Sequence, residues 1–159
     1  GEYYHKMLAE VDEALKNYQE EFPSLRGLKP KWGGFIWFQG WNDMFNQDAL
    51  AQYEENLVHL IKDLRARLSQ PNLPVVVGEL GNMGEDAGTN MKLIREAQRN
   101  ACQRKEWKGR VSFVKTTNFA RPKEESPNVG HGHHWFGNAE SYFLIGDALG
   151  KEMVRLLKN

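Results

Sequence analysis

A polar turn, Gln39-Gly40-Trp41-Asn42-Asp43, directly follows the apolar run 35–38 and carries residue types suited to acyl transfer. A buried parallel strand delivers polar side chains to the carboxyl edge of a sheet in this way. An Asn on such a turn can donate its amide to a developing oxyanion, and Gly40 permits a tight turn. The alternative is a purely structural role for Asn42 and Asp43, as turn formers or helix caps.

A second group of residues that could take part in catalysis lies in one glycine-containing loop and consists of His131, His133 and His134. An imidazole titrates near neutral pH, so one of them can act as a general base beside a serine. We choose His134 for this role because Trp135 and the following helix would hold it in place. A metal site on the three histidines and a solvated polar loop are the alternatives, although further ligands at matching spacing are missing.

The elements that must position these residues follow from the periodicity of apolar residues. Helical spacing predicts four helices, and near-continuous apolar runs predict three strands. The expected helices are 4–18, 50–68, 91–101 and 142–156, the last with Asn138 as N-cap, and the expected strands are 34–39, 74–80 and 111–117. This order predicts a parallel sheet between helical layers, with all strands ending at one rim. Asn42 and His134 would meet there.

Composition restricts the possible partners. The 159 residues contain 21 Lys and Arg and 21 Asp and Glu, so no basic field is available to bind nucleic acid. The apolar runs are too short to span a membrane. Cys102 is the single cysteine and lies in a helical pattern, which favours a buried, inert thiol over a nucleophile.

Three other residues near the predicted rim have competing interpretations. Glu79 follows three valines and is either a structural hydrogen-bond partner or a carboxylate of the site, with the structural role favoured. Trp41 and Trp135 fall on rim loops, where an aromatic ring can stack on a sugar. Together with Gln39, these two tryptophans would shape a substrate pocket.

The blocks 37–43 and 133–142, Trp-Phe-Gln-Gly-Trp-Asn-Asp and His-His-Trp-Phe-Gly-Asn-Ala-Glu-Ser-Tyr, resemble the SGNH (GDSL-like) hydrolases. Within that group the chain is similar to the sialate O-acetylesterase-like carbohydrate esterases. The resemblance implies a flavodoxin-like α/β/α fold and hydrolysis of acetyl esters on acylated carbohydrates, with no metal or other cofactor. By the same pattern, Asn42 and Gly40 match the oxyanion block, and His134 matches the catalytic base.

The sequence departs from this family pattern at two places. The family nucleophile is a serine that follows the first strand, and no segment before Phe35 matches it, since Ser24 lies in a proline-bounded loop. An acid usually stands three residues before the histidine, where this chain has His131. We therefore expect residues 1–159 to form one domain, the carboxyl-terminal part of such a hydrolase, without its first strands. A missing N-terminal segment or a second chain would supply the serine, and the strand at 35–38 would present an unpaired apolar edge.

The rival hypothesis is a non-catalytic carbohydrate-binding or interaction module that keeps the scaffold without the nucleophile. The family resemblance also leads us to expect an extracellular or periplasmic location.

Overall fold

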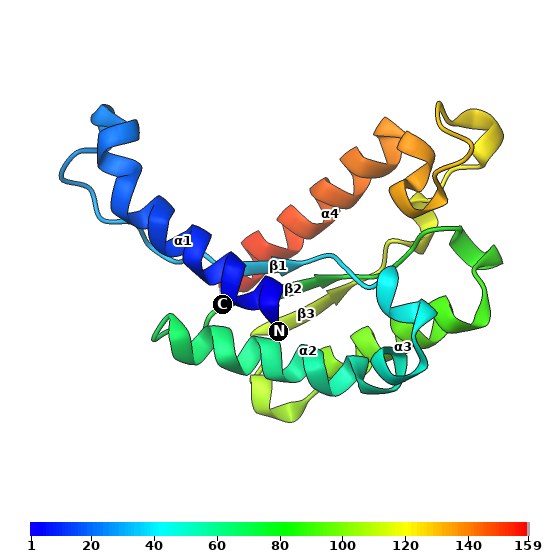
Figure 1. Ribbon diagram of the computed structural model, residues 1–159, viewed down its shortest axis with the longest axis horizontal. Coiled ribbons are helices and arrows are strands. Elements are labelled where there is room, and N and C mark those ends of the chain that lie inside the picture. The colour runs from blue at the N-terminus through cyan, green and yellow to red at the C-terminus, as the bar shows by residue number, and fades with distance from the viewer. Residues whose placement is uncertain (159) are drawn as a thin grey trace. The chain divides into compact units, whose positions relative to one another are not determined.

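The computed structural model describes residues 1–158, which divide into two compact units, the first covering residues 1–32 and the second beginning at Gly33 (Figure 1). The first unit consists of helix α1 (Glu2–Glu21), a short 3-10 turn (Pro23–Leu25) and a loop. No residue of α1 is buried. All residues of the candidate site belong to the second unit.

The second unit is built on a parallel sheet of three strands, β1 (Phe35–Trp37), β2 (Val75–Gly78) and β3 (Val111–Val114). The strands follow one another in the order β1-β2-β3, with β2 in the centre and completely buried. Parallel pairing places the carboxyl ends of all three strands at the same edge. The loops that follow these ends are therefore neighbours.

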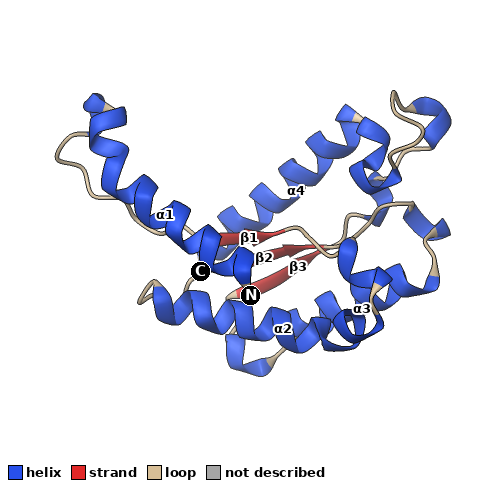
Figure 2. Ribbon diagram, in the orientation of Figure 1, coloured by secondary structure: helices blue, strands red, loops and turns tan. Residues whose placement is uncertain are grey.

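Helices cover both faces of the sheet (Figure 2). Helices α2 (Gln47–Arg67) and α3 (Thr89–Cys102) lie on one face, and α4 (Ala139–Lys158) lies on the other. Successive side chains of a strand point to opposite faces, so Val75 and Val77 join the core under α2 and α3, whereas Val76 packs against α4. This arrangement confirms the predicted three-layer α/β fold with a flavodoxin-like parallel sheet.

Asparagine caps begin two of the helices. The Asn138 Oδ1 accepts a hydrogen bond of 3.0 Å from the Ser141 backbone N–H at the start of α4, which confirms the predicted cap. Asn46 caps α2 in the same way through the Ala49 backbone N–H, at 2.9 Å. Both caps satisfy backbone donors that a helix start leaves without intrahelical partners.

The strands are shorter than the sequence predicts, because side chains take over the backbone hydrogen bonds beyond their ends. The Leu80 N–H donates to the Gln98 side chain instead of to a neighbouring strand. The backbone N–H groups of Thr116 and Thr117 donate to the Glu79 carboxylate. Apolar composition cannot reveal these exchanges.

Strand β1 lies at an edge of the sheet, and within residues 1–158 it pairs only with β2. Two of the apolar side chains around it remain accessible, with Ile36 45% and Phe38 36% exposed. The structure therefore has the apolar edge that the sequence predicts. None of the helices in the described part of the chain combines the length and apolar character of a membrane span.

Candidate functional site

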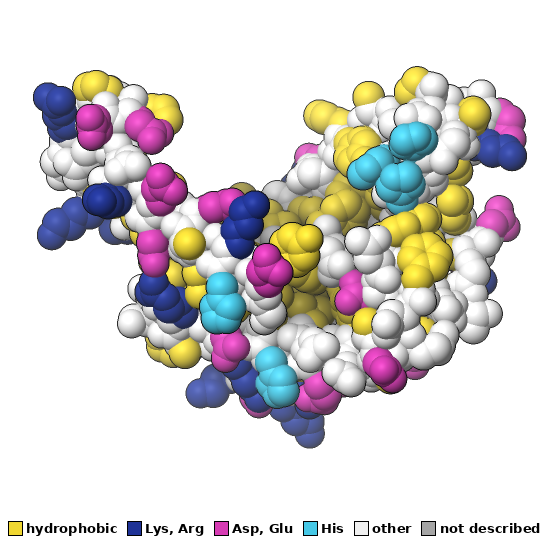
Figure 3. Space-filling model, viewed as in Figure 1, with side chains coloured by type: hydrophobic (Ala, Val, Ile, Leu, Met, Phe, Trp, Pro, Cys, Tyr) yellow, Lys and Arg dark blue, Asp and Glu magenta, His cyan; other side chains and the backbone are white. Residues whose placement is uncertain are grey.

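A cavity of about 420 Å³ opens where the strands end, between the turn after β1 and the loop before α4. Histidine side chains gather beside a hollow in which hydrophobic side chains are visible (Figure 3). The cavity is lined by Phe38, Gln39, Gly40, Trp41, Asn42, Leu80, Asn82, His133, His134 and Trp135. All six residues chosen from the sequence, His134, Asn42, Gly40, Gln39, Trp41 and Trp135, are therefore brought to one cavity.

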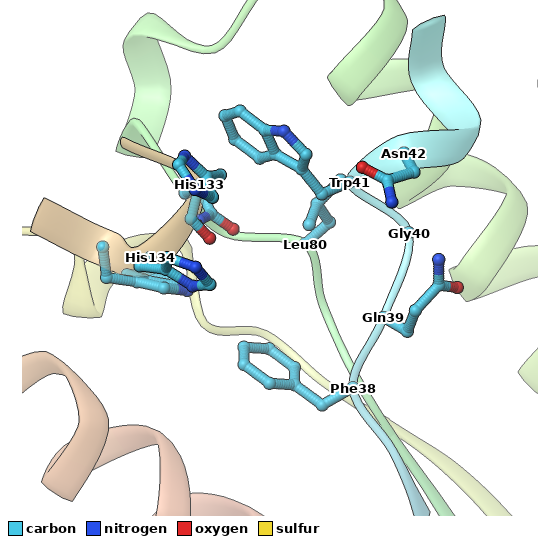
Figure 4. Close-up of a pocket in the computed structure, with 10 residues that line it drawn as sticks. Phe38, Gln39, Gly40, Trp41, Asn42, Leu80, His133 and His134 are labelled. Atoms are coloured by element: carbon cyan, nitrogen blue, oxygen red, sulfur yellow. The ribbon is translucent and has the colours of Figure 1, made fainter. Parts of the chain in front are cut away.

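The Gly40 turn, residues 39–42, forms one wall of the cavity (Figure 4). Gly40 is buried and has a φ of +150°, a conformation that side-chain-bearing residues rarely adopt. A Cβ at this position would lie 2.9 Å from Ile94 Cγ2 and 3.2 Å from the Tyr53 hydroxyl oxygen. Glycine is thus required both by the backbone conformation and by the close approach of α2 and α3.

Asn42 is exposed and opens a short 3-10 helix (Asn42–Phe45). Figure 4 shows Asn42 on the opposite side of the cavity from His133 and His134, whereas the amide end of Gln39 is turned away from the two histidines. The Gln39 amide donates to the Asp43 carboxylate at 2.6 Å, which restrains this side chain at the mouth of the site. An amide facing imidazoles across a cavity fits a donor to an oxyanion opposite a general base.

The histidine loop, residues 131–137, forms the opposite wall. Its backbone is irregular, with positive φ angles of 51° at Trp135 and 52° at Phe136. The Trp135 ring is only 5% exposed and packs on the α4 side of the sheet. Trp135 therefore forms a wall of the cavity and is not an open stacking surface. The Tyr142 hydroxyl donates to the His134 carbonyl at 3.0 Å and ties the loop to α4.

The three histidines of this loop lie side by side. The ring centroids of His133 and His134 are 4.2 Å apart, and His131 is 5.2 Å from His133 and 6.3 Å from His134. Partial removal from water lowers the pKa of His133, and the positive charges that His134 and His131 can carry lower it further. Among residues 1–158, no group of three or more potential ligands is arranged to hold a metal ion.

The ring of Trp41 links the two walls of the cavity. Its centroid lies 5.7 Å from that of His133, so an aromatic surface from the Gly40 turn reaches the histidine loop. Below it, the Phe38 ring lies 6.2 Å from Trp135. These rings make much of the cavity apolar and leave the amides and imidazoles as its polar groups.

Glu79 has a structural role, which is the role that the sequence favoured. Its side chain is 1% exposed, and Oε2 accepts hydrogen bonds from the backbone N–H groups of Thr116 and Thr117 and from the Thr117 hydroxyl. This carboxylate therefore joins the loop after β2 to the loop after β3. It does not line the cavity.

Sequence reasoning missed three groups around the site, Asn82, Arg95 and Gln98. All three are buried and hydrogen-bond to backbone groups of the loops that follow the strands. The sequence carries one signal for two of them, because Arg95 and Gln98 interrupt the apolar stripe of α3 at positions on its buried face. Asn82 lies in a glycine-rich loop and gives no such signal.

No serine of the described chain lines the cavity. Ser126 and Ser141 donate to backbone carbonyl oxygens, and Ser112 donates to the Glu152 carboxylate, so each has a local structural bond. The cavity thus contains a candidate base and a candidate oxyanion donor without a nucleophile from these residues.

A family model described as carbohydrate esterase, sialic acid-specific acetylesterase, matches residues 1–155, a range that contains both walls of the cavity. Neither a search of curated proteins nor a search of solved structures gave a match. The family match confirms the resemblance inferred from the two sequence blocks.

Proposed function

This chain belongs to the sialic acid-specific acetylesterase family of carbohydrate esterases, and from that membership we propose that it forms part of an enzyme that removes acetyl groups from sugars. The observation that carries the proposal is the placement of His134 and Asn42 on facing walls of one cavity. A cavity of about 420 Å³ is of the size that holds small ligands.

In the proposed reaction, a serine hydroxyl attacks the ester carbonyl carbon while His134 accepts its proton. The Asn42 amide donates a hydrogen bond to the oxyanion of the tetrahedral intermediate. Collapse of the intermediate breaks the bond to the sugar oxygen, and His134 returns the proton to that oxygen. Water then releases acetate from the serine by the same route, again with His134 as base. Gln39, Trp41 and Trp135 would shape the part of the cavity that receives the sugar.

The serine itself would come from a segment other than residues 1–158 or from a second polypeptide. The lack of a serine among the cavity-lining residues supports this. The edge of β1 that does not pair with β2 offers a place where such a segment could add a strand, since only Phe38 separates the end of β1 from the Gly40 turn. A serine delivered beside that strand would enter the cavity next to Asn42.

The test is His134→Ala in protein expressed from the complete reading frame, assayed with p-nitrophenyl acetate and an acetylated sugar. We expect turnover to fall by roughly 10²–10⁴-fold, because the general base is lost, while the fold is kept. His59→Ala, an exposed histidine on α2, is the control and should turn over normally. Equal turnover by His134→Ala and the control would refute the assignment.

The second candidate function is a carbohydrate-binding module without catalysis, which the absence of a serine from the cavity lining favours. Calorimetric titration with the same acetylated sugar, combined with the cleavage assay, distinguishes the esterase from the binding module. Binding without any ester cleavage by protein expressed from the complete reading frame would select the binding module. Cleavage that depends on His134 would select the esterase.

A further inference from the structure

We propose that Asn82 is the positioning residue of the histidine loop. Its side chain holds the backbone of His133 and His134 in place on the cavity wall opposite the Gly40 turn. The inference rests on the proposed role of His134. The Asn82 side chain is 1% exposed, and its Nδ2 donates to the carbonyl oxygens of Gly132 at 3.0 Å and His133 at 3.2 Å.

The histidine loop needs such a restraint because its backbone is not held by a regular ladder. Trp135 and Phe136 have φ angles near +50°, and His134 has φ −109° and ψ 33°. Backbone of this kind persists only where surrounding groups determine it. The Asn82 amide supplies two hydrogen bonds to the loop from a different element, the loop after β2.

Asn82 is itself fixed from α3. The Arg95 guanidinium donates to the carbonyl oxygens of Asn82 at 2.7 Å and Leu80 at 2.7 Å. Gln98, one turn further along α3, accepts from the Leu80 N–H at 2.8 Å and donates to the Gln39 carbonyl oxygen at 3.0 Å. One helix therefore determines the positions of both walls of the cavity, the Gly40 turn through Gln98 and the histidine loop through Arg95 and Asn82.

The chemistry of the contact selects an amide. Two carbonyl oxygens must each receive a hydrogen, and a primary amide carries two N–H donors on one nitrogen. Both donors of Asn82 are directed to the loop, so the side chain orients His134 without donating to a substrate. An aspartate at this position would place acceptor oxygens against two carbonyl oxygens, and a leucine would leave both carbonyls without their partner.

The test uses imidazole NMR signals of the ¹⁵N-labelled chain, followed as a function of pH for the unmodified protein and for Asn82→Leu and Asn82→Asp. The pKa of His133 is lowered by partial loss of water around its ring and by the charges that His134 and His131 can carry, so a loosened loop should return its titration midpoint towards the ordinary value. We expect this upward shift in Asn82→Leu, which is the deciding variant, because the carboxylate of Asn82→Asp would raise the midpoint by its own charge as well. Asn90→Leu is the matched control, because Asn90 also donates to a backbone carbonyl, that of Met44 in the 3-10 helix Asn42–Phe45 at 2.9 Å, and its removal should leave the midpoint unchanged.

A folded Asn82→Leu or Asn82→Asp variant with an unchanged His133 midpoint would overturn the proposal. If neither variant folds, the proposal is tested instead by hydrogen exchange of the side-chain amides in the unmodified protein. Slow exchange of both Asn82 amide protons, relative to those of exposed Asn42, is the expected result, and equal rates would refute it. None of these readouts uses ester cleavage, so failure of the proposed function and failure of this inference are separate outcomes.

Discussion

The Tyr53 hydroxyl donates a hydrogen bond of 2.6 Å to the carbonyl oxygen of Gln39, the first residue of the Gly40 turn. Burial raises the pKa of Tyr53 to about 12, so the hydroxyl keeps its proton and remains a donor at any pH that the fold is expected to meet. Gln98 donates to the same carbonyl and also to the Tyr53 oxygen, and the Trp37 indole N–H donates to that oxygen as well. The turn that carries Asn42 is thus anchored by a buried polar cluster.

The first prediction is that Tyr53→Phe lowers the free energy of unfolding by about 1–2 kcal/mol, because the Trp37 indole N–H loses its acceptor and the Gln39 carbonyl loses a donor. Urea unfolding measures the change. Tyr142→Phe removes the same kind of bond, tyrosine hydroxyl to backbone carbonyl, but at the exposed surface. The control should lose less than about 0.5 kcal/mol, and equal losses would contradict the role assigned to Tyr53.

Gly40→Ala should destabilise the fold by on the order of 3 kcal/mol. The new methyl group would clash with Ile94, and the residue would be held at a φ of +150°. Thermal unfolding measures the loss of stability in Gly40→Ala, and Gly130→Ala is the control. A Cβ at Gly130 meets no atom within 4 Å and the position needs no positive φ, so that variant should stay close to the parent. A stable Gly40→Ala protein would show that the turn has another conformation.

Glu79→Gln should cost about 2 kcal/mol of stability, because a neutral amide is a poorer acceptor than a carboxylate for the three bonds from Thr116 and Thr117. Hydrogen exchange at the Thr116 and Thr117 amides should become faster in the same variant. Glu96→Gln, an exposed position on α3, provides the control. Unchanged exchange at the two threonines would contradict the claim that Glu79 holds the loop after β3.

A pH dependence follows from His133. Its pKa in the folded chain lies below the ordinary value near 6.5, so the unfolded chain binds more protons as the pH falls below that value. The stability linked to His133 is therefore complete above about pH 6.5 and declines as the pH falls through the folded pKa. The groups that act on this ring are His131 and His134, together with its partial loss of water.

The corresponding measurement is the urea midpoint at pH 7.5 and at pH 5.0 for the parent chain and for His133→Gln. We expect the midpoint to fall less between the two pH values in the variant. An identical fall in both proteins would show that the crowding of the three imidazoles does not affect stability.

The sequence was sufficient for the parts of this structure that depend on apolar patterning. The three strands, the four helices, the cap at Asn138 and the placement of Asn42 and His134 at one edge of the sheet all follow from periodicity and from parallel topology. The strand ends could not be predicted, because they depend on side chains such as Glu79 and Gln98 that compete for backbone donors across 18 or more positions of sequence. Asn82 was missed for the same reason, since its partners lie fifty residues away.

The placement of Arg95 and Gln98 on α3 has a consequence for how this protein can tolerate change. An inserted or deleted residue in the first turns of α3 would rotate both side chains by about 100° around the helix axis. Their contacts to the Gln39 carbonyl and to the loop that contains Asn82 would be lost together. Point substitutions on the exposed face of α3 should be well tolerated. A change in the length of α3 should instead remove the contacts that hold the histidine loop and the Gly40 turn in position at the same time.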